Sequence, residues 1–198
     1  MLIKSVAELK HQLDRYKARK KWYRHWCARS AVAVIVREGE QGLEALMIKR
    51  AEREGDPWSG HMAFPGGRMD PIDQGGLSTA QRETWEEIGL KPEYYSECLG
   101  RLPDLKATIR RFFKPFIVSC YVFSIEGEPE LELNYEVADV LWVPLSFLAD
   151  KANRKSMQWT RRRKAMTLSC YFYGGERIWG LSLRMLDALI AIAKTENN

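Results

Sequence analysis

The stretch from Glu52 to Gly89 constrains the fold of this 198-residue chain more than any other segment. Its first part, residues 52–76, is dense in turn formers and too long for an ordinary connection, and such loops in compact domains are usually functional. A helix is predicted to start near Ser78, because Ser78 and Gln81 have the spacing of a capping box. Gly89 stands where a helix stop is expected. The other elements must therefore be arranged around one long loop that leads into one helix.

Hydrophobic patterning predicts strands on both sides of this helix. The predicted strands are 31–36 and 43–48 before the helix, and 112–124, 137–143 and 167–173 after it. Two later helical segments are predicted, a turn at 145–150 and a closing amphipathic helix at 180–195. The order of strands, helix, strands and helix favours an α/β or α+β sandwich over a parallel sheet of βαβ units.

The first 28 residues are predicted to form a helical extension. Apolar side chains recur there at helical spacing and predict one helix over residues 2–28, namely Leu2, Val6, Leu9, Leu13 and Tyr16. The basic run at 17–21 fits a solvated helix face better than a nucleic-acid patch. Because the length suits one domain, we expect an extension at 1–28 followed by a single domain at 29–198.

Charge and cysteine usage narrow the class of protein. The formal net charge of +5 favours anionic ligands, but it is too small to favour nucleic-acid binding. The four cysteines are scattered without zinc-ligand spacing, which is typical of reduced thiols in a cytosolic protein. Neither an apolar stretch of about 18 residues nor a signal-peptide pattern is present, so no membrane span is expected and the predicted location is cytoplasmic.

Three glutamates of the predicted helix, Glu83, Glu86 and Glu87, fall on one face at about 100° per residue. Carboxylates this close repel one another, and a cation between them removes the repulsion. Oxygen-only ligands suit Mg²⁺ or Mn²⁺ rather than zinc. Gly66 and Gly67 in the preceding loop let the backbone approach a metal or a phosphate. The alternative is a solvated acidic face, which the three glutamates alone would favour.

Together these residues resemble the Nudix box, Gx5Ex7REUxEExGU, in which U is aliphatic. The matching positions are Arg82, Glu83, Glu86, Glu87, Gly89 and Leu90, after an entry of Phe64-Pro65-Gly66-Gly67. The resemblance implies a Nudix-type α/β/α sandwich with a mixed sheet, here with an N-terminal helix added. It also implies that metal-activated water attacks phosphorus and releases two phosphorylated products.

The sequence departs from the box in one residue type and in its register. Thr84 stands where an aliphatic residue is usual, and the interval from Gly67 to Arg82 is one residue longer than in the box. The upstream glutamate is missing, because counting back from Arg82 reaches Gln74 and counting forward from Gly67 reaches Asp73. The upstream acidic role is therefore expected at Asp70 or Asp73.

With these departures, the sequence resembles the Nudix subgroup that includes coenzyme A diphosphatases. The matching residues, in order, are Arg50, Gly60, 64–67, Asp70 and Asp73, followed by 115–116, Asn134, 136–137, 142–145 and 178–181. The resemblance covers roughly residues 30–190. The subgroup has a Leu-Arg pair between the arginine and the glycine, whereas this chain has 53–58, Arg-Glu-Gly-Asp-Pro-Trp, at a place where substrate contacts are expected.

The resemblance implies a role for each site residue. The expected metal ligands are Glu83, Glu86, Glu87, Gly67, Asp70, Asp73 and Glu136. The expected substrate contacts are Arg50, Arg53, Gly66 and Gly67. Arg82 is expected to orient a metal-binding glutamate through a salt bridge, although a surface ion pair is the alternative. Roles for His61, Trp58 and the basic run 161–164 stay open between substrate contact and ordinary packing or solvation.

Three functions are compatible with these residues. The first is metal-dependent hydrolysis of a diphosphate bond in a nucleoside diphosphate derivative, with coenzyme A or a related compound as the leading substrate. The second is the same chemistry on ADP-ribose or a nucleoside triphosphate. The third, a catalytically silent module that binds a ligand or RNA, is disfavoured because such a module has no reason to keep three mutually repelling carboxylates. The sequence leaves a homodimer open.

Overall fold

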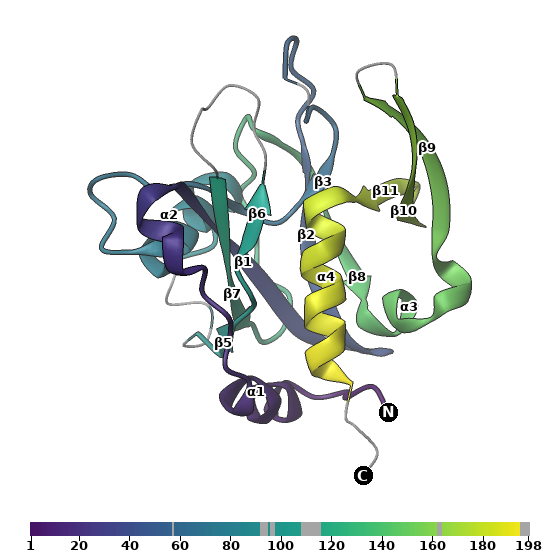
Figure 1. Ribbon diagram of the computed structural model, residues 1–198. Coiled ribbons are helices and arrows are strands. Elements are labelled where there is room, and N and C mark those ends of the chain that lie inside the picture. The colour runs from purple at the N-terminus through teal and green to yellow at the C-terminus, as the bar shows by residue number, and fades with distance from the viewer. Residues whose placement is uncertain (57, 92–94, 96–97, 108–115, 162–163, 195–198) are drawn as a thin grey trace.

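The computed structural model describes the chain except for residues 57, 92–94, 96–97, 108–115, 162–163 and 195–198 (Figure 1). Its main sheet has eight strands: β1 (Ala28–Gly39), β2 (Gly42–Arg50), β3 (Met62–Ala63), β4 (Gly66–Arg68), β5 (Gly100–Arg101), β6 (Leu105–Ala107), β7 (Phe116–Ser124) and β8 (Val137–Pro144). β1 runs parallel to β7 and antiparallel to β2, while β8 pairs antiparallel with the far side of β2. The predicted mixed sheet is confirmed.

A second sheet of three antiparallel strands follows in the chain, formed by β9 (Lys155–Arg161), β10 (Lys164–Tyr173) and β11 (Glu176–Trp179). It leads directly into helix α4 (Gly180–Ala193), and β11 contacts β3 of the main sheet. Figure 1 shows β9 and β10 standing to one side of α4. The second sheet and the main sheet therefore meet near the long loop between β2 and α2.

Helices cover both faces of the main sheet. α2 (Gly76–Ile88) packs through Ala80 and Ile88 against the face of β1 that carries Ala33 and Ile35. On the opposite face, Val34 and Val36 of β1 share a core with side chains of α1 (Val6–Arg15) and α4. Successive side chains of a strand point to opposite faces, and this alternation along β1 separates the two cores. The α/β/α arrangement predicted from the sequence is confirmed.

Helix α2 begins two residues earlier than Ser78. Gly75 is its N-cap, and the Ser78 hydroxyl accepts a hydrogen bond from the Gly75 N–H at 3.1 Å and donates to the Gly75 carbonyl at 2.9 Å. The predicted start near Ser78 is therefore two residues late, because this serine closes the first turn from inside the helix. The predicted end is confirmed, since Gly89 adopts the left-handed conformation, with φ of 68°.

The single helix predicted over residues 2–28 is wrong. α1 ends at Arg15, and the chain continues in irregular backbone to a short 3₁₀ helix, η1 (Trp22–Trp26). Tertiary contacts explain the break: the Lys21 N–H donates to the buried Asp104 carboxylate at 2.9 Å, and the Asp104 N–H donates to the Arg19 carbonyl at 3.2 Å. Helical spacing alone contains no information about this partner.

Other predicted elements differ from the observed ones mainly at their ends. The helical turn at 145–150 is confirmed as α3 (Leu145–Ala149), and a 3₁₀ turn, η3 (Lys151–Asn153), follows it. β9 was not predicted, and β10 begins at Lys164 rather than at residue 167. Residues 112–115 of one predicted strand, and residue 195 of the closing helix, lie outside the described residues.

Candidate active site

The glycine entry forms a short strand between β1 and the acidic helix. In β4, Gly66 pairs with Val32, and Gly67 pairs with Ala31. A Cβ on Gly66 would lie 2.3 Å from the Ala31 carbonyl oxygen, and Gly66 has φ of 149°. A Cβ on Gly67 would lie 2.4 Å from Cδ of Glu83. A side chain at Gly66 would therefore meet the backbone of β1, and one at Gly67 would have to displace the carboxylate of Glu83, against which the backbone lies directly.

Arg82 lies at the centre of the acidic face. Its Nε and Nη2 donate to the two oxygens of Asp73 at 3.0 and 3.1 Å, and its Nη1 lies 2.9 Å from an oxygen of Glu83 and 2.9 Å from one of Glu86. Nη2 also donates to the Arg68 carbonyl at 3.2 Å. The guanidinium thus joins the loop, β4 and the helix, and it offsets part of the negative charge.

Asp73, and not Gln74, faces Arg82. Its carboxylate is 3% exposed and also accepts from the Asp70 N–H at 2.8 Å and the Thr79 hydroxyl at 2.9 Å. The hydrogen bond from Arg82 is the main reason that the pKa of Asp73 falls to about 2. Asp70 is exposed, and its carboxylate accepts from the Ile72 N–H at 3.0 Å. The oxygens of Asp73 are therefore already engaged with protein donors.

The other two glutamates of the motif, Glu83 and Glu87, are shielded from solvent. Glu87 is 4% exposed, and its carboxylate accepts one hydrogen bond, 2.8 Å long, from the Gly66 N–H. Burial raises the pKa of Glu87 to about 7, and burial also raises the pKa of Glu83. Desolvation thus disfavours the charged forms, and a nearby cation would restore them.

The side chains of Glu83, Glu86 and Glu87 offer only carboxylate oxygens as ligands. Such ligands fit a hard divalent cation. Among the described residues, no three His, Cys, Asp or Glu side chains are gathered closely enough to enclose a metal ion. The reason lies in the directions of two side chains, since Glu86 pairs with Arg82 and Glu87 with the Gly66 N–H. The side chain of Glu86 is 51% exposed.

Arg50, Arg53 and Glu136 lie beside this acidic face. Arg50 ends β2 opposite Val137, at an irregularity in the β2–β8 register. Arg53 Nη1 donates to Glu136 at 3.3 Å. The charges of Arg50 and Glu136 both act on the pKa of Glu87, lowering and raising it respectively. The fold therefore brings the predicted metal and substrate residues from four segments into one region.

A cleft of about 760 Å³ opens at this region. That volume is within the range of small-molecule sites. Predicted site residues on its wall are Arg50, Gly66, Gly67 and Glu87, whereas the remaining ones lie outside the lining: Arg53, Asp70, Asp73, Arg82, Glu83, Glu86 and Glu136. The cleft therefore meets the acidic face at Glu87 and the glycine strand.

Aromatic side chains form part of the cleft wall. Ring centroids are 5.8 Å apart for Trp58 and His61, 5.1 Å for His61 and Trp179, and 5.5 Å for Trp159 and Trp179. The sequence left the roles of Trp58 and His61 open, and it did not indicate that Trp159 lies at this cleft. No signal near Trp159 could have found it, because β9 was not predicted and its neighbours in the cleft are distant in sequence.

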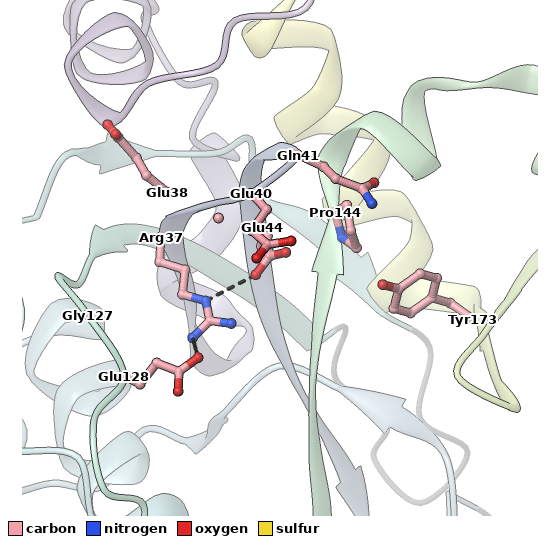
Figure 2. A pocket seen from close by; sticks show the side chains of 10 residues that line it. Arg37, Glu38, Glu40, Gln41, Glu44, Gly127, Glu128, Pro144 and Tyr173 are labelled. Atoms are coloured by element: carbon pink, nitrogen blue, oxygen red, sulfur yellow. Dashed lines mark hydrogen bonds and ion pairs between the residues drawn. The ribbon is translucent and has the colours of Figure 1, made fainter.

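A second cavity, of about 420 Å³, lies at the β1–β2 turn. Figure 2 shows Arg37 there between Glu44 and Glu128, to which it donates at 3.0 and 3.3 Å. Its guanidinium also lies 4.1 Å from the ring centroid of Trp142. This cavity contains none of the predicted site residues, and its arginine already has carboxylate partners. The larger cleft is therefore the candidate active site.

Comparison with known families gives a match to the NUDIX domain over residues 28–163, more than half of the chain. The chain belongs to the Nudix hydrolase family. The family predicted from the box is confirmed. A Nudix hydrolase from Alicyclobacillus acidocaldarius has a similar fold, with a TM-score of 0.55 at 19% identity over 85% of this chain and 93% of that one.

Two curated relatives show how far the Nudix similarity extends. An uncharacterized Schizosaccharomyces pombe protein, C14C4.10c, is 37% identical over 52% of this chain and 32% of its own length. The human mitochondrial coenzyme A diphosphatase NUDT8 is 31% identical over 77% of this chain and 64% of its own length. This Nudix chain thus spans about a third of the first relative and under two thirds of the second. No described helix is both long and apolar enough to cross a membrane.

Proposed function

We propose that this Nudix hydrolase cleaves a diphosphate bond in a nucleoside diphosphate derivative, with coenzyme A or a related compound as the leading substrate. One observation carries the proposal: the buried carboxylate of Glu87 joins the acidic face of α2 to the glycine strand at the wall of the 760 Å³ cleft. A diphosphate in that cleft would lie beside both the backbone N–H groups of the glycine strand and the carboxylates.

The proposed cofactor is Mg²⁺ or Mn²⁺. Glu83, Glu86 and Glu87 would hold it, with the Gly67 backbone and Glu136 as further ligands. When bound, such an ion supplies positive charge to the phosphates and lowers the pKa of a coordinated water. Arg82 would position Glu83 and Glu86 through the ion pairs described above.

Asp73 is proposed to act on the site through Arg82. Its four hydrogen bonds from protein donors support a positioning role for this aspartate rather than metal ligation. The exposed Asp70 is then the acid of the loop that is more accessible to an ion. In this proposal the loop that is one residue longer than the box places an aspartate where the missing glutamate would pair with the arginine.

Arg50 and Arg53 are the proposed phosphate contacts. Arginine suits this role because its planar donors match phosphate oxygens. Coenzyme A carries an additional 3′-phosphate, and the basic chain favours that extra charge. The name of the human relative supports the same substrate class. Residues 162–163 of the basic run 161–164, whose role the sequence left open between solvated linker and phosphate contact, lie outside the described residues.

The decisive measurement is kcat/KM on a panel of coenzyme A, dephospho-coenzyme A, ADP-ribose and a nucleoside triphosphate, because specificity is a ratio of these values. We expect coenzyme A to lead. A tenfold preference for ADP-ribose or the triphosphate, equal to about 1.4 kcal/mol in transition-state binding, would reject the substrate but keep the reaction class. Absence of turnover on the whole panel would favour the silent module.

The remaining proposals concern domain boundaries, oligomeric state and location in the cell. We retain the division into an extension at 1–28 and a Nudix domain at 29–198, although Leu9 and Leu13 of the extension are buried in the core beside α4. A homodimer stays open, and a cytoplasmic location stays a prediction. The name of the human relative places that protein in mitochondria.

A further inference from the structure

Arg50 is an arginine of the cleft whose hydrogen-bonding capacity is only partly used. Its side chain is 29% exposed, and it lines the cleft together with Glu87 and Gly66. Nε of Arg50 is buried and has no hydrogen-bond partner among the described residues. The charge of Arg50 also lowers the pKa of Glu87, which places the guanidinium within electrostatic reach of the acidic face.

Asp56 occupies part of this guanidinium. Its Oδ2 accepts a hydrogen bond from Arg50 Nη2 at 2.8 Å, while its Oδ1 accepts from the Trp58 N–H at 3.0 Å. The hydrogen bond from Arg50 and the one from Trp58 outweigh the effect of burial, so the pKa of Asp56 is lowered. The side chain is therefore an anion at neutral pH, already paired with a cation of the cleft.

The loop that carries Asp56 is a compact turn. The Asp56 N–H donates to the Arg53 carbonyl at 3.2 Å, and the Ser59 N–H donates to the Asp56 carbonyl at 3.1 Å. The Ser59 hydroxyl accepts from the Arg53 N–H at 2.7 Å. These bonds join Arg53, Asp56 and Ser59 within the loop. Its carboxylate is thus held at Arg50 by the local fold rather than by a flexible side chain alone.

We propose that Asp56 is a specificity-determining residue of this site, because its carboxylate covers an edge of the Arg50 guanidinium that a substrate phosphate must take over. The inference rests on the proposed function, in which Arg50 is a phosphate contact. A carboxylate and a phosphate need the same planar donors, so Asp56 must leave Nη2 before a phosphate can take the guanidinium edge that it covers. The exchange weakens binding of every phosphate at Arg50 and favours the group with the greater negative charge, which gains more from the guanidinium.

The substitution Asp56→Asn separates this role from a structural one. Asparagine keeps an Oδ1 acceptor for the Trp58 N–H and is favoured in such turns, but it has no charge to pair with Arg50. The control is Glu52→Gln, which removes one negative charge from the same loop, since Glu52 makes no ion pair with Arg50 in the described structure. Asp56→Ser keeps an acceptor for the turn and serves in its place if Asp56→Asn lowers the melting temperature.

Binding is measured by titration calorimetry with ADP in the presence of EDTA, and turnover is measured with the best substrate of the panel. We expect Asp56→Asn to lower the Kd for ADP by about three- to tenfold, the scale of one hydrogen bond or partly exposed ion pair. KM should fall by a similar factor, whereas kcat should stay within about twofold. Combined with Arg50→Gln, the same substitution should have no effect on ADP binding.

Two results would overturn the inference: unchanged or weaker ADP binding by Asp56→Asn, or equal tightening by Glu52→Gln. Failure of the proposed function has a different signature, because the wild-type protein would then turn over nothing on the panel. In that case tighter ADP binding by Asp56→Asn would still support competition for Arg50.

Discussion

Asp73 and Arg82 are joined by two hydrogen bonds, 3.0 and 3.1 Å long, that connect the glycine loop to the acidic face of α2. Through the same guanidinium, Asp73 is connected to Glu83 and Glu86. In its proposed positioning role, Asp73 would set the directions of two proposed metal ligands through Arg82.

Asp73→Asn should lower kcat more than it changes KM. Asparagine cannot form the paired ionic contact, so Arg82 would lose its anchor and the two glutamates their orientation. We expect a loss of about tenfold to 10²-fold in kcat, the range of positioning-residue effects. Steady-state kinetics of Asp73→Asn, Asp70→Asn and Gln74→Ala would check this. If only Gln74→Ala lost activity, the register assigned to the loop would be wrong.

Glu86→Gln and Glu87→Gln should each lower kcat by about 10²-fold or more, the scale of a lost transition-state electrostatic contact. The change is isosteric and removes charge from a proposed metal ligand. Circular dichroism should show an intact fold, and Glu128→Gln, at the second cavity, is the matched control. Activity of either variant within about twofold of wild type would exclude that residue as a ligand.

Turnover should require Mg²⁺ or Mn²⁺ and should rise towards alkaline pH. The ion lowers the pKa of its bound water, so more hydroxide is available as the pH increases. Rates are to be measured before and after removal of metal with excess EDTA, and again after Mg²⁺ or Mn²⁺ is restored. Undiminished turnover in EDTA would contradict the metal proposal.

The ion pair of Asp73 should make stability depend on pH below about 4. The pKa of Asp73 is about 2 in the folded protein and 3.8 in its unperturbed state. A lowered folded pKa stabilises the fold above pH 3.8, and this contribution disappears as the pH falls towards 2. Urea unfolding of wild type and Asp73→Asn should give free energies that differ more at pH 6 than at pH 2.5. A constant difference across that interval would contradict the assignment.

Gly67→Ala should destabilise the fold and reduce activity together. The added Cβ would lie 2.4 Å from Cδ of Glu83, so either β4 or the glutamate must move. Gly75→Ala is the control, because a Cβ at that position has no atom within 4 Å. Thermal melting and steady-state kinetics should show a clear loss for the first variant and a small effect for the second. Equal behaviour would mean that β4 or the Glu83 side chain has freedom to shift.

The sequence predicted those parts of the fold that depend on local patterns. Gly89 ends α2 as expected, because a left-handed residue has a local signature. The break in the N-terminal helix could not be predicted, since it depends on a hydrogen bond between Lys21 and Asp104, which are far apart in the chain.

The same distinction applies to the candidate site, where local patterns predicted some features and long-range packing determines others. The spacing of Glu83, Glu86 and Glu87 predicted their common face, and the glycine entry predicted a close backbone approach. The pairing of Asp56 with Arg50 and the place of Trp159 in the cleft depend on loop and sheet packing. Neither has a periodic pattern that sequence reasoning could use.

Asp104 also holds the N-terminal segment against the main sheet. Its fully buried carboxylate accepts hydrogen bonds from Arg101, Ser119 and the Lys21 N–H, so residues around Lys21 are fastened to β5 and β7. Opening that segment would remove the Lys21 N–H from the Asp104 carboxylate, which is buried in the closed structure. Amide hydrogen exchange at Lys21 should therefore proceed with the slow, sheet-wide opening of the molecule and not with local fraying of its first residues.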